Sequence, residues 1–173
     1  MSPSHPTRRR FVTQLATLVP LTVLRRGPVP GMTTSQGAGI SRTAEAIHQE
    51  LPFTAPPQRL YEALLDQQQF ARVTGGQATT IDRAEGGAFS LFGARIKGRN
   101  IALETNARIV QAWRSEGWDK GVYSIVRFEL HPAGTGTLLA FDHTGFPVGQ
   151  ADHLATGWKS NYWDPLTRFL AGA

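Results

Sequence analysis

The feature that most constrains the fold of this 173-residue chain is a long apolar stripe near its C-terminus, which follows a series of short strands. Residues 150–170 have a helical pattern that predicts a rod of about 30 Å at 1.5 Å per residue. Pro165 lacks the N–H that would bond to the Asn161 carbonyl, so we expect a kink there. The stripe consists of large side chains at helical spacing, namely Leu154, Trp158, Tyr162, Leu166 and Phe169.

The segment before this helix alternates strands with tight turns that contain Gly or Asn. A strand is also expected at 46–53, where apolar and polar side chains alternate, and one or two short helices should follow it around Leu60 and Phe70. Connections this short require antiparallel pairing, because parallel strands need long crossovers. The remaining expected strands are 79–84, 88–92, 95–104, 107–115, 122–130 and 137–144.

The order of elements predicts an α+β fold of the helix-grip kind. In this fold a curved antiparallel sheet of six or seven strands is covered by the long C-terminal helix, with one or two short helices after the first strand. A sheet of that size twists and curls, whereas the helix stays nearly straight. The helix therefore contacts the sheet at its ends and leaves space near its middle, which either a ligand or bulky side chains must fill.

Seven residues are candidates for lining such a cavity, and the pattern leaves open whether they surround a ligand or form a packed core. Aromatic side chains at helical spacing are typical of a core, and this applies to Trp163 as well as to the candidates. If Tyr123 and Arg127, which share one face of strand 122–130, also face the cavity, they would orient a ligand carboxylate. The candidates are Trp113, Tyr123, Phe128, His143, Leu154, Trp158 and Tyr162.

The residues give no support to a metal site, a cofactor or a catalytic centre. The chain has no cysteine, and a histidine site would need His48, His143 and His153 to converge from two strands and the helix. His143 follows Asp142, but adjacent strand residues point to opposite faces, so we expect a hydrogen-bonded histidine and no base-and-orienter pair. No nucleophile elbow, glycine-rich phosphate loop or carboxylate pair is present. Binding is therefore favoured over catalysis.

The isoelectric point near 10.2 does not indicate a nucleic-acid partner, because the positive charge is unevenly distributed. Residues 1–43 contain six arginines and no acid, whereas the remaining residues carry 12 Lys and Arg against 13 Asp and Glu. A nucleic-acid-binding domain needs its positive charge on the folded surface that meets the phosphates. We expect no nucleic-acid partner.

The N-terminal segment is typical of an export signal. Residues 7–12 (TRRRFV) resemble the twin-arginine consensus, and the apolar run 11–24 has the length of a signal peptide's apolar region. That run is too short for a transmembrane helix, so no integral span is expected in the mature protein. Translation from Met32 would instead leave a cytoplasmic protein. We expect a signal-like segment and linker at 1–43 and one domain at 44–173.

Four segments in the same order resemble the domain named after the activator of Hsp90 ATPase homologue 1, a member of the START-like or Bet v 1-like (SRPBCC) superfamily. The resemblance covers about 130 residues and implies the fold derived above. It rests on GAFSLF at 87–92, IVQAWR at 109–114, FDHTGFP at 141–147 and GWKSNYWDPL at 157–166.

The resemblance leaves three functions open. Relatives of this fold bind lipids or other small hydrophobic molecules, which favours a non-enzymatic binding module with an apolar cavity. The family's name implies an interaction with an Hsp90-type chaperone, which applies only if this chain stays in the cytoplasm. Some relatives are cyclases or hydrolases that use the cavity.

Overall fold

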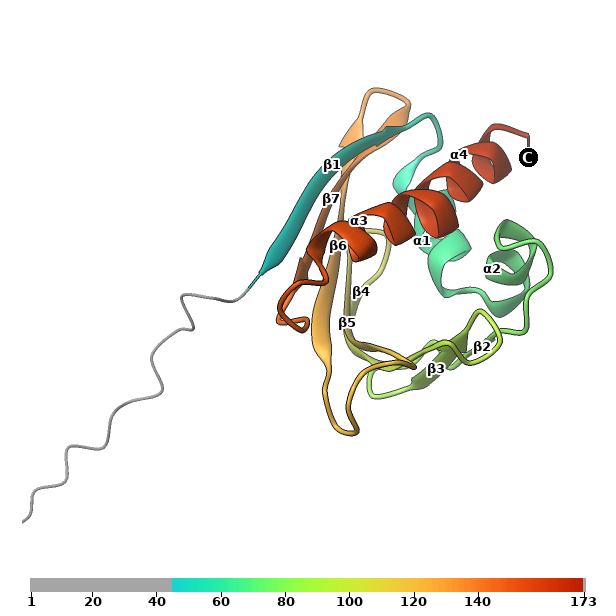
Figure 1. Cartoon of the computed structure of the whole chain (residues 1–173). Coiled ribbons are helices and arrows are strands. Elements are labelled where there is room, and N and C mark those ends of the chain that lie inside the picture. Colours follow the sequence, from blue (N-terminus) through green and yellow to red (C-terminus); the bar gives the residue numbers. More distant parts are fainter. Residues whose placement is uncertain (1–44, 173) are drawn as a thin grey trace, which may run out of the picture. The chain divides into compact units, whose positions relative to one another are not determined.

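The protein was studied as a computed structural model that describes residues 45–172 (Figure 1). The expected export signal, the linker and the alternative start at Met32 lie outside the described residues. Seven antiparallel strands form one sheet in the order β1-β7-β6-β5-β4-β3-β2. The strands are β1 Ala46–Phe53, β2 Thr80–Ile81, β3 Ala88–Leu91, β4 Ile96–Glu104, β5 Arg108–Ser115, β6 Ser124–Ala133 and β7 Gly136–Thr144.

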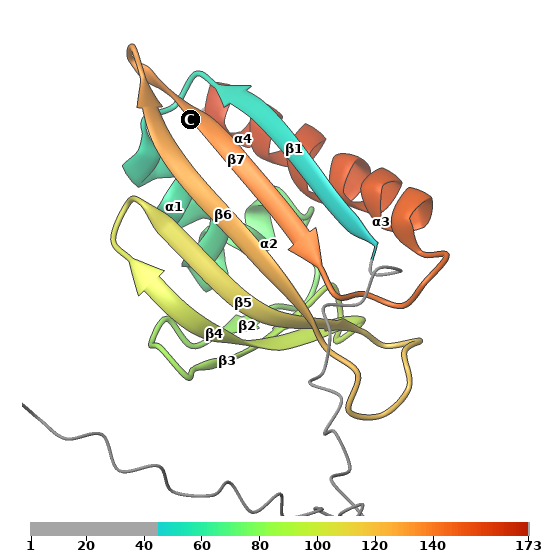
Figure 2. The same ribbon diagram turned by 90° about the vertical axis from the view of Figure 1, so that its left-hand side faces the viewer.

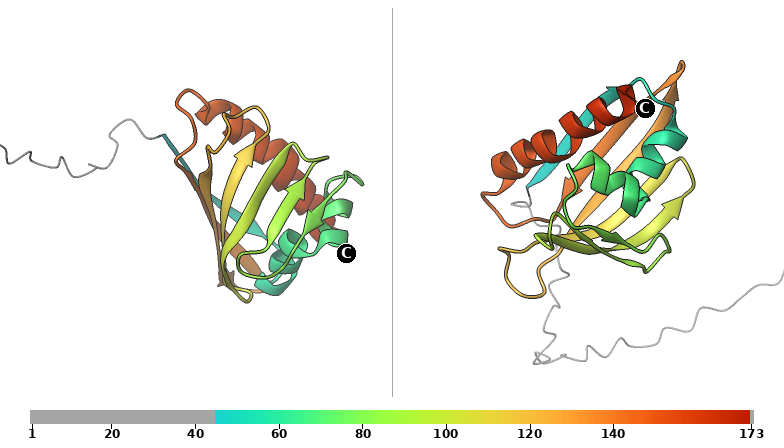
Figure 3. Two further views of the ribbon diagram at one scale, coloured as in Figure 1. Left: turned by 90° about the horizontal axis from the view of Figure 1, so that it is seen from below. Right: turned by 90° about the vertical axis from the view of Figure 1, so that its right-hand side faces the viewer.

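All of the described helices lie on one face of this sheet, and nothing within residues 45–172 packs over the other face (Figures 1 and 2). Two short helices, α1 Pro57–Leu65 and α2 Gln67–Val73, follow β1. The C-terminal helical run consists of α3 Ala151–Trp158, the π-helical turn η1 Lys159–Trp163 and α4 Asp164–Ala171. Figure 3 shows this run crossing the sheet, with α1 and α2 beside its C-terminal part. The expected helix-grip architecture is confirmed.

The expected strand at 79–84 is shorter in the structure and includes only Thr80 and Ile81. Its end has a local cause, because the Asp82 side chain accepts a hydrogen bond from the Ala84 backbone N–H at 3.1 Å. Such a turn, closed by an aspartate side chain, competes with strand pairing.

The expected disturbance of the C-terminal helix occurs one turn earlier than Pro165 and takes the form of a π turn. The Asp164 N–H donates to the carbonyl of Lys159, five residues back, instead of the usual four. Pro165 then lies in the first turn of α4, where a missing N–H costs little. Because the turn is wide, residues five apart lie above one another, and the rings of Trp158 and Trp163 stack 5.4 Å apart.

The core lies between the sheet and the helices. Alternation along β6 decides which side chains enter it, with Val126 and Phe128 buried while Ile125 and Arg127 are exposed. The C-terminal run contributes both of its tryptophans, so Trp163 belongs to the core although it lies outside the predicted stripe. No helix in the 45–172 segment is both long and apolar enough to traverse a bilayer.

One glycine in the sheet is required by its neighbours. Gly98 of β4 pairs with Phe89 of β3 on one side and with Trp113 of β5 on the other. A Cβ atom at this position would lie 2.3 Å from the Phe89 ring and 2.0 Å from the Ala112 carbonyl oxygen. Only glycine allows the Phe89 ring to cover the strand at this point.

Candidate functional site

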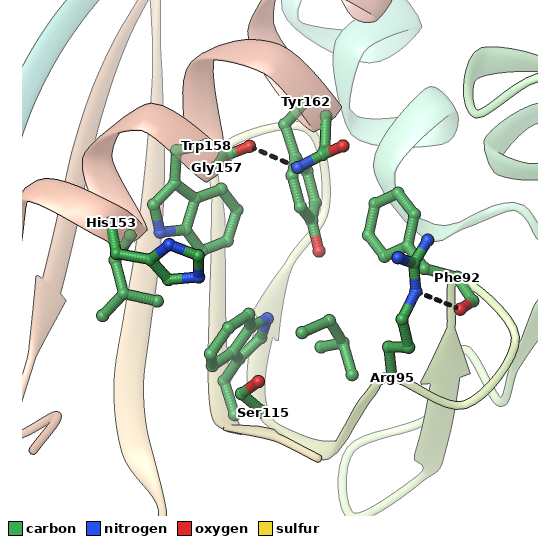
Figure 4. A pocket seen from close by; sticks show the side chains of 11 residues that line it. Phe92, Arg95, Ser115, His153, Gly157, Trp158 and Tyr162 are labelled. Carbon is green, nitrogen blue, oxygen red and sulfur yellow. Dashed lines mark hydrogen bonds between the residues drawn. The ribbon is translucent and has the colours of Figure 1, made fainter. Parts of the chain in front are cut away.

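A cleft of about 250 Å³ lies between the C-terminal helical run and the strands β3 to β5, and it opens to solvent on one side (Figure 4). Its wall combines apolar side chains with a few polar ones. The lining residues are Phe92, Arg95, Ile96, Trp113, Ser115, His153, Leu154, Gly157, Trp158, Asn161 and Tyr162.

The turn between β3 and β4 builds one wall of the cleft in an unusual backbone conformation. Phe92, Gly93 and Ala94 have φ angles of 54°, 68° and 72°, which is the left-handed region. A bulky residue such as Phe92 adopts this conformation only when its surroundings hold it there. Its ring is held by edge-to-face packing against Phe70 at 5.7 Å and Tyr162 at 5.3 Å.

The same turn places the Arg95 guanidinium at the mouth of the cleft. Its Nε donates to the Phe92 carbonyl at 3.2 Å, and its Nη2 donates to the Gln77 side-chain oxygen at 2.9 Å. His153 of α3 is exposed at the same mouth (Figure 4). The lining contains Arg95 but no Lys, Asp or Glu, so the one charged side chain in the cleft wall is positive.

Two buried polar groups in the cleft wall have no hydrogen-bond partner among the described residues. They are the hydroxyl of Tyr162 and the indole nitrogen of Trp113. Tyr162 as a whole is only 5% exposed, and Trp113 is 4% exposed. The Tyr162 hydroxyl points into the cleft (Figure 4). Burial raises the pKa of Tyr162, and the Trp113 N–H, which approaches the hydroxyl without meeting the geometry of a full hydrogen bond, opposes this only in part by a hydrogen-bond-type contact. The hydroxyl therefore stays neutral and keeps its proton.

Behind this cleft the interior is filled by aromatic rings. The Trp158 ring is 4.5 Å from that of Phe141 and 4.2 Å from that of Tyr162, measured between centroids. Phe128 packs at 5.4 Å against Phe141. Most of the space that a straight helix leaves over a curved sheet is thus occupied by side chains, and the cleft is the part left open.

A chain of hydrogen bonds runs through this interior from the helix to the sheet. The Trp158 indole N–H donates to Nδ1 of His143 at 3.0 Å, and the His143 Nε2 lies 2.7 Å from Oγ of Ser124. Because an indole only donates, Nδ1 must be the acceptor and Nε2 carries the proton. The Ser124 hydroxyl then donates to the Trp113 carbonyl at 3.0 Å. Burial lowers the pKa of His143 to about 4, so the neutral form is held.

The structure brings together four of the seven sequence candidates, and Trp113, Leu154, Trp158 and Tyr162 all line the cleft. Phe128 lies deeper, beside a void of only about 10 Å³. His143 is fully buried behind Trp158. Tyr123 does not line the cleft; it is 50% exposed, with the Arg114 guanidinium 5.7 Å from its ring centroid.

The wall contributed by Phe92, Arg95 and Ile96 was not predicted from the sequence, because a left-handed turn in which only the middle residue is glycine has no clear sequence signal. The strand expected at 88–92 did not indicate that the Phe92 ring would turn towards the helix.

The outer face of the sheet carries an ion-pair cluster, and Arg127 belongs to it, so the alternative in which Arg127 faces the cavity does not hold. Asp142 of β7 accepts from Arg127 of β6 at 2.6 Å and lies 2.7 Å from Nδ1 of His48 on β1. Partial burial alone would raise the pKa of Asp142, but the bonds from Arg127 and His48 outweigh it and lower that pKa. Within residues 45–172 no three His, Asp or Glu side chains converge as metal ligands.

Comparison with known proteins identifies the family. The model of the family described as activator of Hsp90 ATPase homolog 1-like protein matches residues 54–171. The chain belongs to this family. As a domain of the activator of Hsp90 ATPase homolog 1-like family, it is 31% identical over 125 residues to an activator of 90 kDa heat shock protein ATPase homolog from Dictyostelium discoideum. That match covers 72% of the chain but 32% of the relative, so the chain spans about a third of its length.

Solved structures show the same fold. The domain is similar to an HSP90 activator from Plasmodium falciparum, with a TM-score of 0.68 and 26% identity over 75% of this chain and 96% of the other. It is also similar to CalU16 from Micromonospora echinospora, with a TM-score of 0.64 and 27% identity over 73% and 76% of the two chains.

Proposed function

We propose that this activator of Hsp90 ATPase homolog 1-like domain is a non-enzymatic binding module that takes a small hydrophobic molecule into the cleft beside the C-terminal helix. The observation that carries the proposal is an open, mostly apolar cleft in an interior that is otherwise filled by aromatic rings. Its volume of about 250 Å³ lies just below the range of about 300–1,000 Å³ of drug-sized ligand sites. A compact one- or two-ring molecule fits better than a long lipid chain.

The test uses indane, a two-ring hydrocarbon, and a variant that narrows the cleft. Gly157 lines the cleft in α3, and a Cβ there would meet only the Asn161 amide nitrogen, at 3.8 Å. Gly157→Leu therefore adds bulk at the wall without a backbone clash. The matched control is Gly117→Leu, which adds the same group where nothing lies within 4 Å.

Indane should raise the melting temperature of the wild type by a few degrees at about ten times its Kd, since binding to the native state alone stabilises it by about 1.4 kcal/mol. Gly117→Leu should respond like the wild type, and Gly157→Leu should respond less. If indane raised the melting temperature of all three proteins equally, it would bind outside the cleft. If it raised none of them, the result would count against the cleft as a binding site.

A second candidate function is a protein interaction with an Hsp90-type chaperone. It is supported by the names of the relatives and by the aromatic filling of most of the interior. The outer face of the sheet, which bears no helix of the described segment, carries the Asp142 ion-pair cluster and the exposed side chains of Tyr123 and Ile125. Stimulation of a purified Hsp90-type ATPase by the domain, unchanged by Gly157→Leu, would favour this candidate.

The location of the protein separates the two candidates, and we propose export through the twin-arginine-like residues 7–12. An exported domain does not meet a cytosolic chaperone, whereas a small-molecule carrier works on either side of the membrane. Native mass spectrometry of protein from its own host tests both ligand binding and export. It detects a retained ligand, and it detects the loss of roughly the first 30 to 45 residues that signal removal would cause. An intact chain with residues 1–43 still attached would argue against export.

A further inference from the structure

Resting on the proposed binding function, we infer that the cleft selects uncharged molecules that carry a carbonyl oxygen, which accepts hydrogen bonds from both the Tyr162 hydroxyl and the Trp113 indole N–H. The inference starts from the two polar atoms in the cleft wall that have no partner among the described residues. An unpaired buried donor is unfavourable, so a ligand whose acceptor atom pairs with it gains affinity.

The two groups determine the chemistry of the ligand atom. The indole N–H only donates, and the phenol can donate because it stays neutral in its buried position. Both residues line one cleft, and the Trp113 N–H lies close enough to the Tyr162 hydroxyl to lower its pKa by a hydrogen-bond-type contact, although the geometry of a full hydrogen bond between them is not met. A carbonyl oxygen has two lone pairs and can accept from two such donors at once.

Charge decides between a carbonyl and a carboxylate. The buried end of the cleft, at Trp113 and Tyr162, contains no cation, whereas the Arg95 guanidinium lies at the exposed mouth. A carboxylate placed between the two buried donors would lose its hydration without a paired charge, which is unfavourable. An uncharged ketone, aldehyde, ester or lactone avoids this loss.

The apolar surroundings determine the rest of the molecule. Phe92, Ile96, Leu154 and Trp158 provide the apolar part of the wall, and the volume of about 250 Å³ limits the guest to a compact body. The expected ligand is therefore a small cyclic or aromatic carbonyl compound, with its oxygen at the buried end and its hydrocarbon body towards the mouth.

The experiment compares 1-indanone with indane, which share a rigid shape and differ by the carbonyl oxygen. Both are titrated into the wild type, into Tyr162→Phe and into the control Tyr61→Phe, which removes a hydroxyl from a buried residue that does not line the cleft. Proton–nitrogen NMR spectra follow the indole N–H of Trp113, assigned with Trp113→Phe, because this signal moves downfield when the N–H donates to a ketone.

We expect Tyr162→Phe to weaken 1-indanone binding by about two- to tenfold, the effect of one neutral hydrogen bond, and to leave indane binding no weaker. Tyr61→Phe should change neither affinity. In the wild type, 1-indanone should shift the Trp113 signal further downfield than indane does.

Three other outcomes would overturn the inference. If both probes bind and Tyr162→Phe affects them equally, the cleft binds hydrophobic molecules without selecting a carbonyl, and the proposed function stands alone. If the Tyr162→Phe substitution shifts the Trp113 signal in the absence of a probe, and 1-indanone does not shift that signal in the wild type, the Trp113 N–H and the Tyr162 hydroxyl bond to each other and not to a ligand. If neither probe binds the wild type, the proposed function fails together with the inference.

Discussion

The indole nitrogen of Trp158 lies 3.0 Å from Nδ1 of His143, and this hydrogen bond joins the C-terminal helix to strand β7 in the middle of the core. The bond requires an unprotonated Nδ1. A proton on that atom would place two donors opposite each other in a buried site, so the state of His143 and the docking of the helix depend on each other.

Stability should therefore fall in mild acid. The pKa of His143 is lowered by burial from 6.5 to about 4 in the folded protein. As the pH falls from about 6.5 to about 4, His143 becomes protonated in the unfolded chain but stays neutral in the folded one. The free energy of unfolding therefore decreases by roughly 3 kcal/mol. Urea unfolding at a series of pH values measures this slope. His143→Gln should flatten it, whereas the control His153→Gln, at an exposed position, should keep it.

Truncation of Trp158 should be strongly destabilising because the residue is only 2% exposed and its ring packs against Phe141, Tyr162 and Trp163. We expect Trp158→Ala to lower the free energy of unfolding by about 3–5 kcal/mol, as is typical of a large core side chain. Chemical denaturation measures the change. A loss below about 1 kcal/mol would mean that the ring is not part of a packed core.

Removal of the Tyr162 hydroxyl should not lower the free energy of unfolding, whereas removal of a hydrogen-bonded buried hydroxyl should lower it. Because this hydroxyl is buried without a partner, Tyr162→Phe should leave stability unchanged or raise it by up to about 1 kcal/mol. Ser124→Ala is the matched comparison, since it removes a buried hydroxyl that bonds to His143 and to the Trp113 carbonyl. It should cost about 1–3 kcal/mol. Equal losses in both variants would show that Tyr162 has a bonded partner.

Two glycines should respond to alanine in opposite ways. Gly157→Ala should stabilise the protein by about 0.5–1 kcal/mol, since it improves helix propensity and its Cβ meets only Asn161 at 3.8 Å. Gly98→Ala should destabilise it by about 1–3 kcal/mol or more, because its Cβ would overlap Phe89 and the Ala112 carbonyl. Thermal unfolding of both variants beside the wild type gives the two signs.

The outer ion-pair cluster should contribute little. Asp142 bonds to Arg127 and His48 on a solvent-exposed face, so Asp142→Asn should cost less than about 1 kcal/mol. The loss should shrink further in 1 M salt, where charges are screened within about 3 Å. A loss of several kcal/mol that salt does not change would contradict this account.

The fold could be predicted from the sequence because apolar and polar side chains alternate along the strands and the turns between them contain Gly or Asn. On the strand around Phe128, the pattern alone separated the inner from the outer residues. The same rule correctly placed Asp142 and His143 on opposite faces. The short extent of β2 was not predictable in this way, since it depends on the Asp82 side chain capturing a backbone N–H.

The candidate site was less accessible to sequence reasoning. Side chains on the helix were found because periodicity reveals which face is buried, as with Leu154 and Trp158. Tyr123 was wrongly counted among the cavity candidates, because alternation places it on the same outer face as the exposed residues Ile125 and Arg127. Phe92 and Arg95 were missed because their positions follow from a left-handed turn that only the assembled packing of Phe92 against Phe70 and Tyr162 maintains.

The wide turn at Lys159–Trp163 amounts to one additional residue within an otherwise α-helical run. Deleting a single residue there would restore a regular helix and rotate everything beyond it by about 100° relative to Trp158. Trp163 would then leave its stack on Trp158, and the bond from its indole nitrogen to Gln49 would break. One deleted codon in this segment is thus enough to change which ring closes the interior, which gives the lineage a simple genetic route to a differently shaped core.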